Sequence, residues 1–490
     1  MNNSSDNKGK KILGYLFPGL ITLLVMLIVL VAKGIWPFGS SRIDLFDNMQ
    51  QVAPLYAHLW DAMHGDASIW FDWYTGLGTN VSMSMSAFSM ISPFNLFLYL
   101  CPRDYILEFI SVLTVIKTFV MSVTMYAFIN KRYNSLSYNI KALFAVAYAF
   151  CGYVLLYASC FTPWMDIVAL FPLLMMALDI MEKTGKKLFY IIMVAVMFII
   201  NYYLAAMSLV YILLVGGMYL IFMCDKKERC KKAWNVGIGT FTGIALSAFM
   251  LIPVFAQLSQ SQRTGNTESL VSQYFSWISN PTFRSFSLGE FERIMMFYGM
   301  GLFFVIIFTG IHRSMKAVGY KNDEAARRFN WYAISLIVIV MVQAIAEGTN
   351  IMWHFGSYNG YTLRNGYIIA FTLICLSCAY ADKVLVNDCI KKKKAVIQAV
   401  VTVMAVIYDK LPVNSYVAAF VFFIAVFAVM LVIHIIGVTV MKNGYKVSIV
   451  ISLVAVEVFI GAFAMTGPPK FYTYAPYQYG DYVQLAVNAT

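Results

Sequence analysis

Residues Ile12–Ala32 read ILGYLFPGLITLLVMLIVLVA, a run of 21 residues with no charged side chain. A helix needs about 20 apolar residues to cross a hydrocarbon layer of about 30 Å. No water satisfies the backbone there, so the run must be helical. Lys8, Lys10 and Lys11 precede it and no small-residue cleavage site follows it, which indicates a retained signal anchor.

Comparable apolar blocks recur along the chain, because 60% of the 490 residues are hydrophobic and only 12% are charged. In a soluble globular chain about half of the residues are apolar and about a quarter are charged. The pattern predicts an all-α, polytopic transmembrane helix bundle of about 13 spans, near 12–33, 105–129, 141–159, 166–182, 188–204, 205–224, 233–256, 294–312, 331–347, 365–381, 395–408, 415–441 and 447–467. The shorter stretch Ser86–Cys101 contains Ser92-Pro93 and is interpreted as re-entrant or interfacial.

The positive charge of the chain, +12, does not indicate nucleic-acid binding. Counting alternate loops from the N-terminus, about 26 of the 36 Lys and Arg residues fall in one set, as expected of cytoplasmic loops. We therefore expect a multi-pass protein of the cell membrane, surrounded by lipid, with a cytoplasmic N-terminus. The Lys391–Lys394 loop is then cytoplasmic and the C-terminus is extracytoplasmic.

The domain organisation predicted from these loops is a transmembrane domain over 1–467 and a short extracytoplasmic tail over 468–490. Its outside loops are 34–104, 257–293 and 347–364, and the first is long. The inside loops are short and contain no phosphate-binding motif, which disfavours an ATP-driven pump. Polar residues are concentrated outside, so we expect the function there.

Three acids at the outer side are candidates for chemistry. Asp44 and Asp47 are three residues apart and share one face if the segment is helical. Either could act as a general base or bind a metal, or could simply cap a helix. Asp166 opens a predicted span, where a carboxylate is costly unless it is paired or used. Its alternative role is to cap that helix.

Lys117 lies in the middle of a predicted span and must have a partner. That partner is either an anionic phosphate or a membrane acid such as Glu347 or Glu457. The other polar candidates for substrate contact could equally be interfacial or structural, and they are Gln51, Asn201, Tyr202, Arg263 and Arg364. The five histidines show no metal-ligand spacing, and the residues do not decide whether a divalent metal ion or any other cofactor takes part.

An ordered set of short motifs resembles the bacterial YfhO membrane-protein family. The motifs of the first outside loop are Asp47-x-x-x-Gln51-x-x-Pro54, Tyr74-x-Gly76-x-Gly78 and Ser92-Pro93-Phe94-Asn95. The later positions are Lys117, Gly152-Tyr153, Trp164-Met-Asp166, Pro172, Asn201-Tyr-Tyr203, Pro253 and Gln262-Arg263. The resemblance covers most of residues 12–380 and is weaker beyond.

This resemblance implies a membrane glycosyltransferase of the GT-C type. Such an enzyme moves a sugar from a polyprenyl-phosphate-linked donor to an extracytoplasmic acceptor, here a cell-wall polymer such as teichoic acid. On the resemblance Asp47 is the candidate base, with Asp44 its rival, and Asp166 is the second acid. Lys117 and Arg263 are the candidate contacts of the lipid phosphate. Many YfhO-like chains continue into an outside domain, whereas this sequence ends soon after its last predicted span; either the domain is absent or the chain is shortened, which leaves acceptor recognition open.

Two other functions remain open at this point. A transporter or flippase of a lipid-linked substrate would use Lys117, Glu347 and Glu457 as charges along its pathway. A non-catalytic scaffold would organise other proteins through its loops. The enzyme hypothesis makes a prediction that the others do not: Asp47 and Asp166 should meet across one outward-facing cavity.

Overall fold

The computed structural model describes residues 2–259 and 296–384, apart from positions 45, 76–77, 318, 355–360 and 362, together with 454, 455, 458 and 461. The predicted spans beyond 384, the tail 468–490, Arg263, Glu457 and Lys391–Lys394 lie outside these residues. The longer helices are α1 Asn2–Ala32, α4 Ile106–Arg132, α5 Tyr138–Ala149, α7 Trp164–Thr184, α8 Leu188–Ile200, α9 Tyr202–Phe222, α10 Arg229–Leu246, α11 Ala248–Ser259, α15 Gly301–Lys316, α16 Glu324–Ile345 and α18 Tyr367–Val384.

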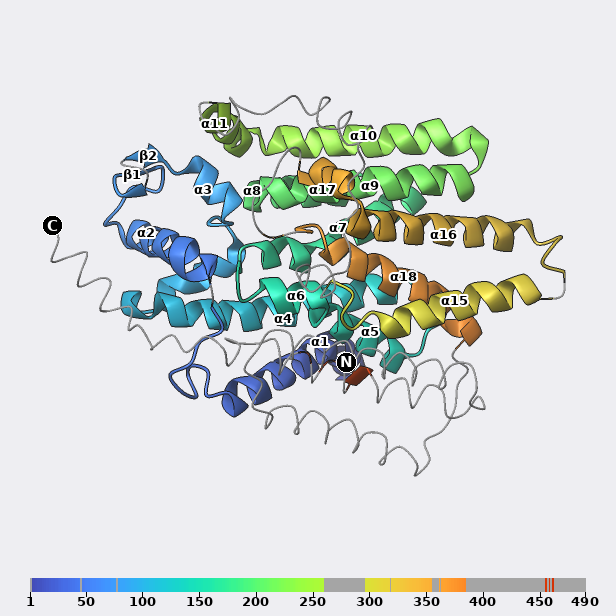
Figure 1. Ribbon diagram of the computed structural model, residues 1–490, viewed down its shortest axis with the longest axis horizontal. Helices are drawn as coiled ribbons and strands as arrows, with labels where there is room; N and C mark the ends of the chain where they lie inside the picture. Colours follow the sequence, from blue (N-terminus) through green and yellow to red (C-terminus); the bar gives the residue numbers. More distant parts are fainter. Residues whose placement is uncertain are drawn as a thin grey trace.

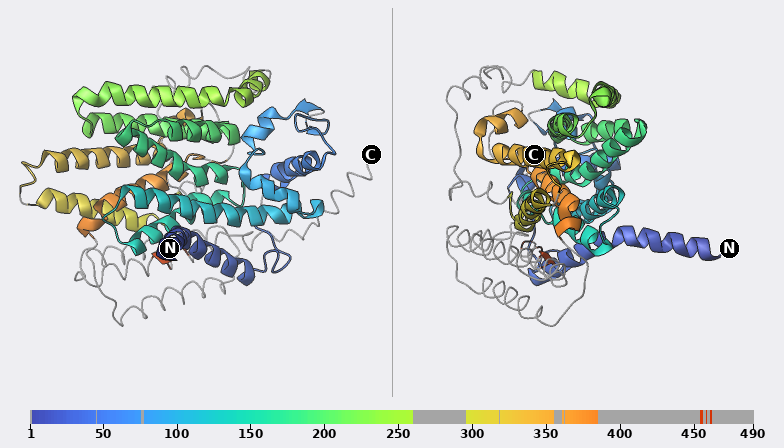
Figure 2. Two further views of the ribbon diagram at one scale, coloured as in Figure 1. Left: turned by 180° about the vertical axis from the view of Figure 1, so that it is seen from behind. Right: turned by 90° about the vertical axis from the view of Figure 1, so that its right-hand side faces the viewer.

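Most of these helices run side by side along the long axis of the molecule, as Figure 1 shows. Helix α4 lies at the centre of one half and packs on α1, α5 and α7, while α8 packs on α10 and α15 on α18. Helix α1 leaves the body at one side, which is clearest in the right-hand view of Figure 2. Pro18 lies inside α1 and removes one backbone donor there.

Six described helical segments are long and apolar enough to cross a membrane, or seven if α10 and α11, bent by 75° at Ser247, form one span. The predicted helix bundle is therefore confirmed, but the number of about 13 spans is not. Several of the predicted spans contain helices that are shorter than the predicted ranges. Helix α8 has 13 residues and ends at Ile200, and α15 begins at Gly301 and has 16 residues. Helix α18 carries a short apolar segment over Tyr367–Ala381.

The first predicted outside loop folds into its own short elements at one end of the bundle, to the left in Figure 1. These are the π-helical turn η1 Asn48–Val52, α2 Ala53–His64, the antiparallel strands β1 Phe71–Asp72 and β2 Thr79–Asn80, α3 Ser82–Ala87, and the 3-10 helices η3 Pro93–Leu100 and η4 Arg103–Tyr105. The guanidinium of Arg103 donates two hydrogen bonds to the Asp61 carboxylate, of 2.6 and 2.8 Å, and so ties α2 to the start of α4. The segment interpreted as re-entrant or interfacial contains no long helix.

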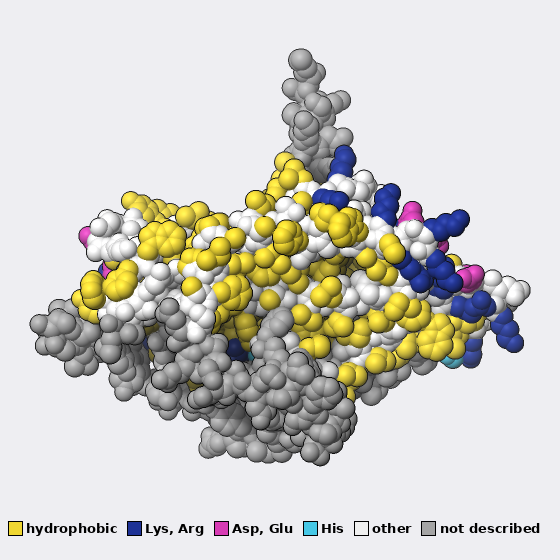
Figure 3. Space-filling view, turned by 90° about the horizontal axis from the view of Figure 1, so that it is seen from above, with side chains coloured by type: hydrophobic (Ala, Val, Ile, Leu, Met, Phe, Trp, Pro, Cys, Tyr) yellow, Lys and Arg dark blue, Asp and Glu magenta, His cyan; other side chains and the backbone are white. Residues whose placement is uncertain are grey.

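Charged side chains gather at the opposite end. Figure 3 shows Lys and Arg clustered to the right, where the α9–α10 and α15–α16 turns lie. Exposed members of this cluster include Lys226, Lys227 and Lys231. One end is thus basic and the other carries the folded first loop, which is the asymmetry expected if the basic end is cytoplasmic.

Candidate functional site

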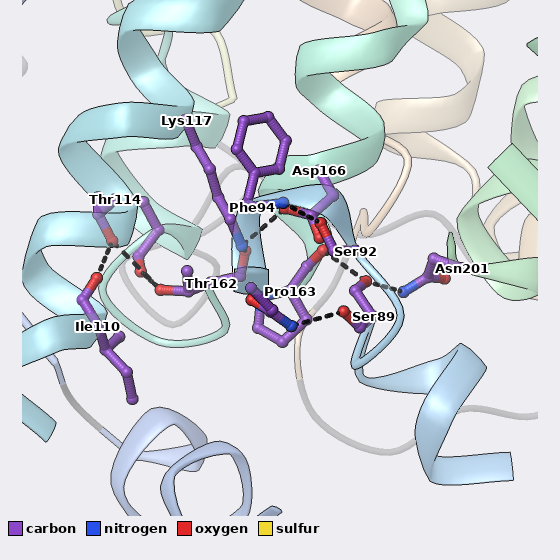
Figure 4. Close-up of polar contacts among 12 residues, drawn as sticks. Ser89, Ser92, Phe94, Ile110, Thr114, Lys117, Thr162, Pro163, Asp166 and Asn201 are labelled. Carbon is purple, nitrogen blue, oxygen red and sulfur yellow. Dashed lines mark hydrogen bonds and ion pairs between the residues drawn. The ribbon is translucent and has the colours of Figure 1, made fainter. Parts of the chain in front are cut away.

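The Lys117 ammonium and the Asp166 carboxylate form an ion pair in the interior. Lys117 comes from the middle of α4 and Asp166 from the first turn of α7, and the Nζ to Oδ1 distance is 2.7 Å. Both side chains are 0% exposed. Figure 4 shows the two groups pointing toward each other. Of the two roles predicted for Lys117, the structure shows the ion pair, and the partner seen among the described residues is Asp166; the Glu347 side chain and Glu457 lie outside them.

The first outside loop covers this pair. The Ser89 and Ser92 side chains lie beside Asp166, as Figure 4 shows, but the Ser89 hydroxyl donates to the Pro163 carbonyl at 2.9 Å and the Ser92 hydroxyl accepts from the Phe94 backbone at 3.2 Å. The Phe94 ring lies 5.8 Å from the Lys117 ammonium, which also donates to the carbonyl oxygen of Thr162, at 3.1 Å. Among the described residues neither Asp166 oxygen has a hydrogen-bond partner, so the attraction to Lys117 has to offset the burial of the carboxylate. Asp166 exposes no surface, so the predicted cavity shared by Asp47 and Asp166 is not seen: the loop that covers Asp166 excludes solvent.

Asp47 belongs to a segment that is bonded to the turn between α6 and α7. Its neighbour Asn48 is buried and holds the α6–α7 turn, in which α6 spans Gly152–Tyr157. The Asn48 amide group donates to the carbonyls of Ala158 and Ser159, and its Oδ1 accepts from the Thr162 backbone at 2.8 Å. Since Thr162 also contacts Lys117, a single turn links the segment of Asp47 to the ion pair.

Asp47 itself is half-buried and faces an aromatic group. Its carboxylate lies near the Tyr361 phenol, whose titration it affects. Burial, Cys160 and the Asp47 charge raise the pKa of the Tyr361 phenol above its usual range, so the phenol keeps its proton and can donate it to Asp47. The Tyr361 ring stacks edge-on against Trp164, with centroids 5.6 Å apart. Trp164 in turn begins α7, two residues before Asp166.

Arg364 completes this group. Its guanidinium carbon lies 5.5 Å from the Trp164 ring centre and 5.6 Å from that of Tyr203. Its Nη1 donates to the Tyr203 hydroxyl at 3.3 Å, and the same hydroxyl lies 2.7 Å from Nδ1 of His354. We call the six residues that meet here the outer cluster, namely Asp47, Trp164, Tyr203, His354, Tyr361 and Arg364.

Backbone strain is concentrated around the outer cluster and the ion pair. The non-glycine residues with positive φ in the described part of the chain are four, Phe46, Ser89, Tyr361 and Leu363. Phe46 precedes Asp47, Ser89 lies beside Asp166 in Figure 4, and Tyr361 and Leu363 come three residues and one residue before Arg364. Such a conformation costs about 1–3 kcal/mol per residue and is concentrated at functional sites. The sequence analysis had no signal for these four positions, because none is glycine or asparagine.

Asp44, the rival base, lies in a different environment. It is 3% exposed, the described residues give it one ion-pair contact, Arg42 at 3.7 Å, and Arg42 also lies 3.6 Å from Glu108. Within the same part of the chain, neither carboxylate oxygen of Asp44 has a hydrogen-bond partner. Burial raises the pKa of Asp44 to about 6, although Arg42 opposes the shift. A general base must reach the acceptor hydroxyl, so the geometry favours Asp47 over Asp44.

We expect Asp44→Asn to stabilise the protein at neutral pH. The folded-state pKa of about 6 lies above the ordinary value of 3.8, so the ionised carboxylate costs stability as the pH rises from 3.8 to 6. A shift of this size corresponds to roughly 3 kcal/mol above pH 6 and to none below pH 3.8. Thermal unfolding in detergent between pH 4 and pH 8 measures the difference. A variant that is less stable than the parent at pH 7.5 would contradict it, and Asp66→Asn, at an exposed position, is the control.

The other residues predicted to contact the substrate differ in their exposure and in their partners. Gln51 is exposed one turn after Asp47. The Asn201 side chain caps α9 by accepting from the Leu204 backbone, and it donates to the Ala87 carbonyl. Asn201 is therefore engaged in structural bonds, and the backbone of Tyr202 donates to Ser86. No group of three potential metal ligands occurs among the described residues.

Comparisons with known proteins were made for the whole chain. The profile of the family described as "Bacterial membrane protein YfhO" matches residues 19–486. No curated protein matches. Similar solved structures include ArnT from Cupriavidus metallidurans bound to undecaprenyl phosphate, with 12% identity, a TM-score of 0.44 and coverage of 91% of this chain and 77% of that one. The apo state of that ArnT gives 14%, 0.45 and the same coverage.

Proposed function

We propose, from the premise that this chain belongs to the bacterial YfhO family of membrane proteins, that it is a membrane glycosyltransferase of the GT-C type. It transfers a sugar from a polyprenyl-phosphate-linked donor to an extracytoplasmic cell-wall polymer such as teichoic acid. The observation that carries the proposal is the outer cluster. It combines a half-buried carboxylate, a cation stacked between aromatic rings and strained backbone.

The proposed reaction assigns a role to each charged group of the outer cluster. The Asp47 carboxylate accepts the proton of the acceptor hydroxyl while that oxygen attacks the anomeric carbon of the donor sugar. The bond from the anomeric carbon to the phosphate oxygen breaks, and its electron pair leaves with the lipid phosphate. Arg364 stabilises the charge that develops on this leaving group. A single displacement inverts the anomeric centre.

The transport hypothesis has less support from the charges it needs. It uses Lys117 as a pathway charge, but Lys117 exposes no surface and its charge is balanced by Asp166. A pathway charge must meet the substrate or water. The other two charges of the transport hypothesis are Glu347 and Glu457. The side chain of the first and all of the second lie outside the described residues, so no contact given above supports transport.

Mass spectrometry of a deletion strain tests the proposed function. We expect the strain to lose one sugar modification from its wall polymers and to accumulate the corresponding polyprenyl-phosphate sugar, because the donor is no longer consumed. Complementation with the parent gene should reverse both changes. A deletion strain with unaltered polymers and unaltered polyprenyl lipids would refute the proposal. Accumulation of the donor with no loss from any polymer would refute the polymer acceptor alone.

A further inference from the structure

The direction of the hydrogen bonds in the outer cluster can be derived from the chemistry of its members. A guanidinium has donors only, so the Tyr203 oxygen accepts the hydrogen bond from Nη1 of Arg364. The Tyr203 hydroxyl proton is then available for Nδ1 of His354, 2.7 Å away. With its proton on Nε2, neutral His354 accepts this bond at Nδ1, and with its proton on Nδ1 it donates to the second lone pair of the Tyr203 oxygen. Both tautomers continue the chain from Arg364 through Tyr203 to His354, and the direction in which Tyr203 donates places the His354 proton on Nε2.

The environment keeps His354 neutral, as this direction requires. His354 ends the outer helix α17, Glu347–His354, and is 7% exposed. Burial, with the Arg364 charge as the second cause, lowers the pKa of His354 to about 3. An imidazolium would be a donor at both nitrogens and could not accept from Tyr203.

The position of Arg364 is fixed from several sides. Its Nε donates to the Tyr361 carbonyl at 3.3 Å, and the Tyr153 hydroxyl donates to the Arg364 carbonyl at 2.8 Å. The Trp164 and Tyr203 rings flank its guanidinium. A planar guanidinium held in this way loses little side-chain entropy when it binds, and its fork of donors fits the oxygens of a phosphate.

We propose that Arg364 is the receptor for the phosphate of the lipid-linked substrate, and that Tyr203 and His354 are positioning residues that aim its guanidinium. The inference rests on the proposed function for the identity of the lipid, and it assigns to Arg364 the role expected of Lys117. Lys117 is occupied by Asp166 in the interior, whereas Arg364 lies in the same cluster as Asp47. The ligand class is a phosphate ester, and the recognised group is the phosphate.

Binding measurements separate this inference from sugar transfer. Purified protein in detergent is titrated with undecaprenyl phosphate, with undecaprenol and with inorganic phosphate, and the thermal shift gives the apparent affinity. We expect Arg364→Gln to weaken the binding of undecaprenyl phosphate by about 10- to 100-fold, as for the loss of hydrogen bonds to a charged group, and to leave undecaprenol binding unchanged. Arg328→Gln is the matched control, because Arg328 donates to the Phe222 carbonyl at the basic end.

The positioning roles have their own variants. Tyr203→Phe keeps the ring but removes the hydroxyl, and we expect binding to weaken by about 3- to 10-fold, the value of one hydrogen bond. Tyr211→Phe is the control. Tyr211 lies on the same helix as Tyr203, α9, and the change removes a hydroxyl that contacts Thr372 of α18. His354→Phe should weaken binding like Tyr203→Phe, and His354→Gln should restore part of it by supplying an acceptor. A merely structural role would lower the stability of the ligand-free protein and leave the ratio of the two lipid affinities unchanged.

Each outcome decides a different claim. Equal affinities of the parent and Arg364→Gln for undecaprenyl phosphate would overturn the receptor role. If inorganic phosphate shifts the parent as strongly as the lipid does, Arg364 recognises free phosphate and the lipid assignment is overturned. If Arg364→Gln loses the lipid phosphate but the parent transfers no sugar, the inference stands and the proposed function falls.

Discussion

Lys117→Met should destabilise the protein by about 3–5 kcal/mol, which is the cost of leaving one member of a buried ion pair without its partner. Asp166 exposes no surface, and Lys117 is the ion-pair partner that the described residues give it. Equilibrium unfolding in mixed detergent micelles measures the effect. The control is Lys131→Met, which removes an exposed lysine from the end of the same helix α4.

The double variant Lys117→Met/Asp166→Asn distinguishes this explanation from a packing defect. It removes both charges and retains side chains of similar volume, so we expect it to recover most of the lost stability. A double variant as unstable as the sum of both single variants would contradict the pairing. A stable Lys117→Met protein that no longer binds undecaprenyl phosphate would instead favour the phosphate role of Lys117.

Asp47→Asn should reduce sugar transfer by about 100- to 10,000-fold, the range expected when a general base is removed. The amide keeps the size of the side chain but cannot accept the proton of the acceptor hydroxyl. The rate constant kcat should fall while the protein remains in the membrane at the parent level. Quantitative blotting and an assay with labelled polyprenyl-phosphate sugar measure the two quantities.

Asp44→Asn is the matched control for Asp47, because it lies three residues earlier and is sealed from solvent. We expect it to retain transfer while its stability at neutral pH rises. The opposite result, with transfer lost in Asp44→Asn and kept in Asp47→Asn, would exchange the roles of the two acids. Loss in both variants would indicate that the first loop is sensitive to any change and would remove the assignment of Asp47 as base.

The sequence predicted the parts of this protein that depend on local composition. The apolar runs and the basic loops identified a helix bundle, and Ser92-Pro93 marked an interruption in the segment before α4. The number of spans was less predictable, since hydropathy cannot distinguish a helix of 13 residues such as α8 from a longer span. Bends such as the one at Ser247 also have no clear hydropathy signal.

The candidate site was predictable only in its residue types. Mid-span Lys117 required a partner, and Asp166 was marked as costly unless paired, yet nothing in the spacing joined residues from α4 and α7. Tyr361 and Arg364 come within reach of Asp47 through packing between segments more than 300 residues apart, which no local pattern encodes. The strained Phe46 and Tyr361 were equally invisible, because strain is imposed by the surrounding structure.

The bonds of Asn48 with the α6–α7 turn have a consequence for the order of assembly. The partners of Asn48, between Ala158 and Thr162, are synthesised more than 100 residues later. The loop that carries Asp47 is therefore synthesised before its anchor exists, and α4, α5 and α6 must be made first. Long-range contacts of this kind form late and slow the acquisition of structure. Synthesis of this protein thus includes an interval in which the loop that carries Asp47 is present but not yet secured.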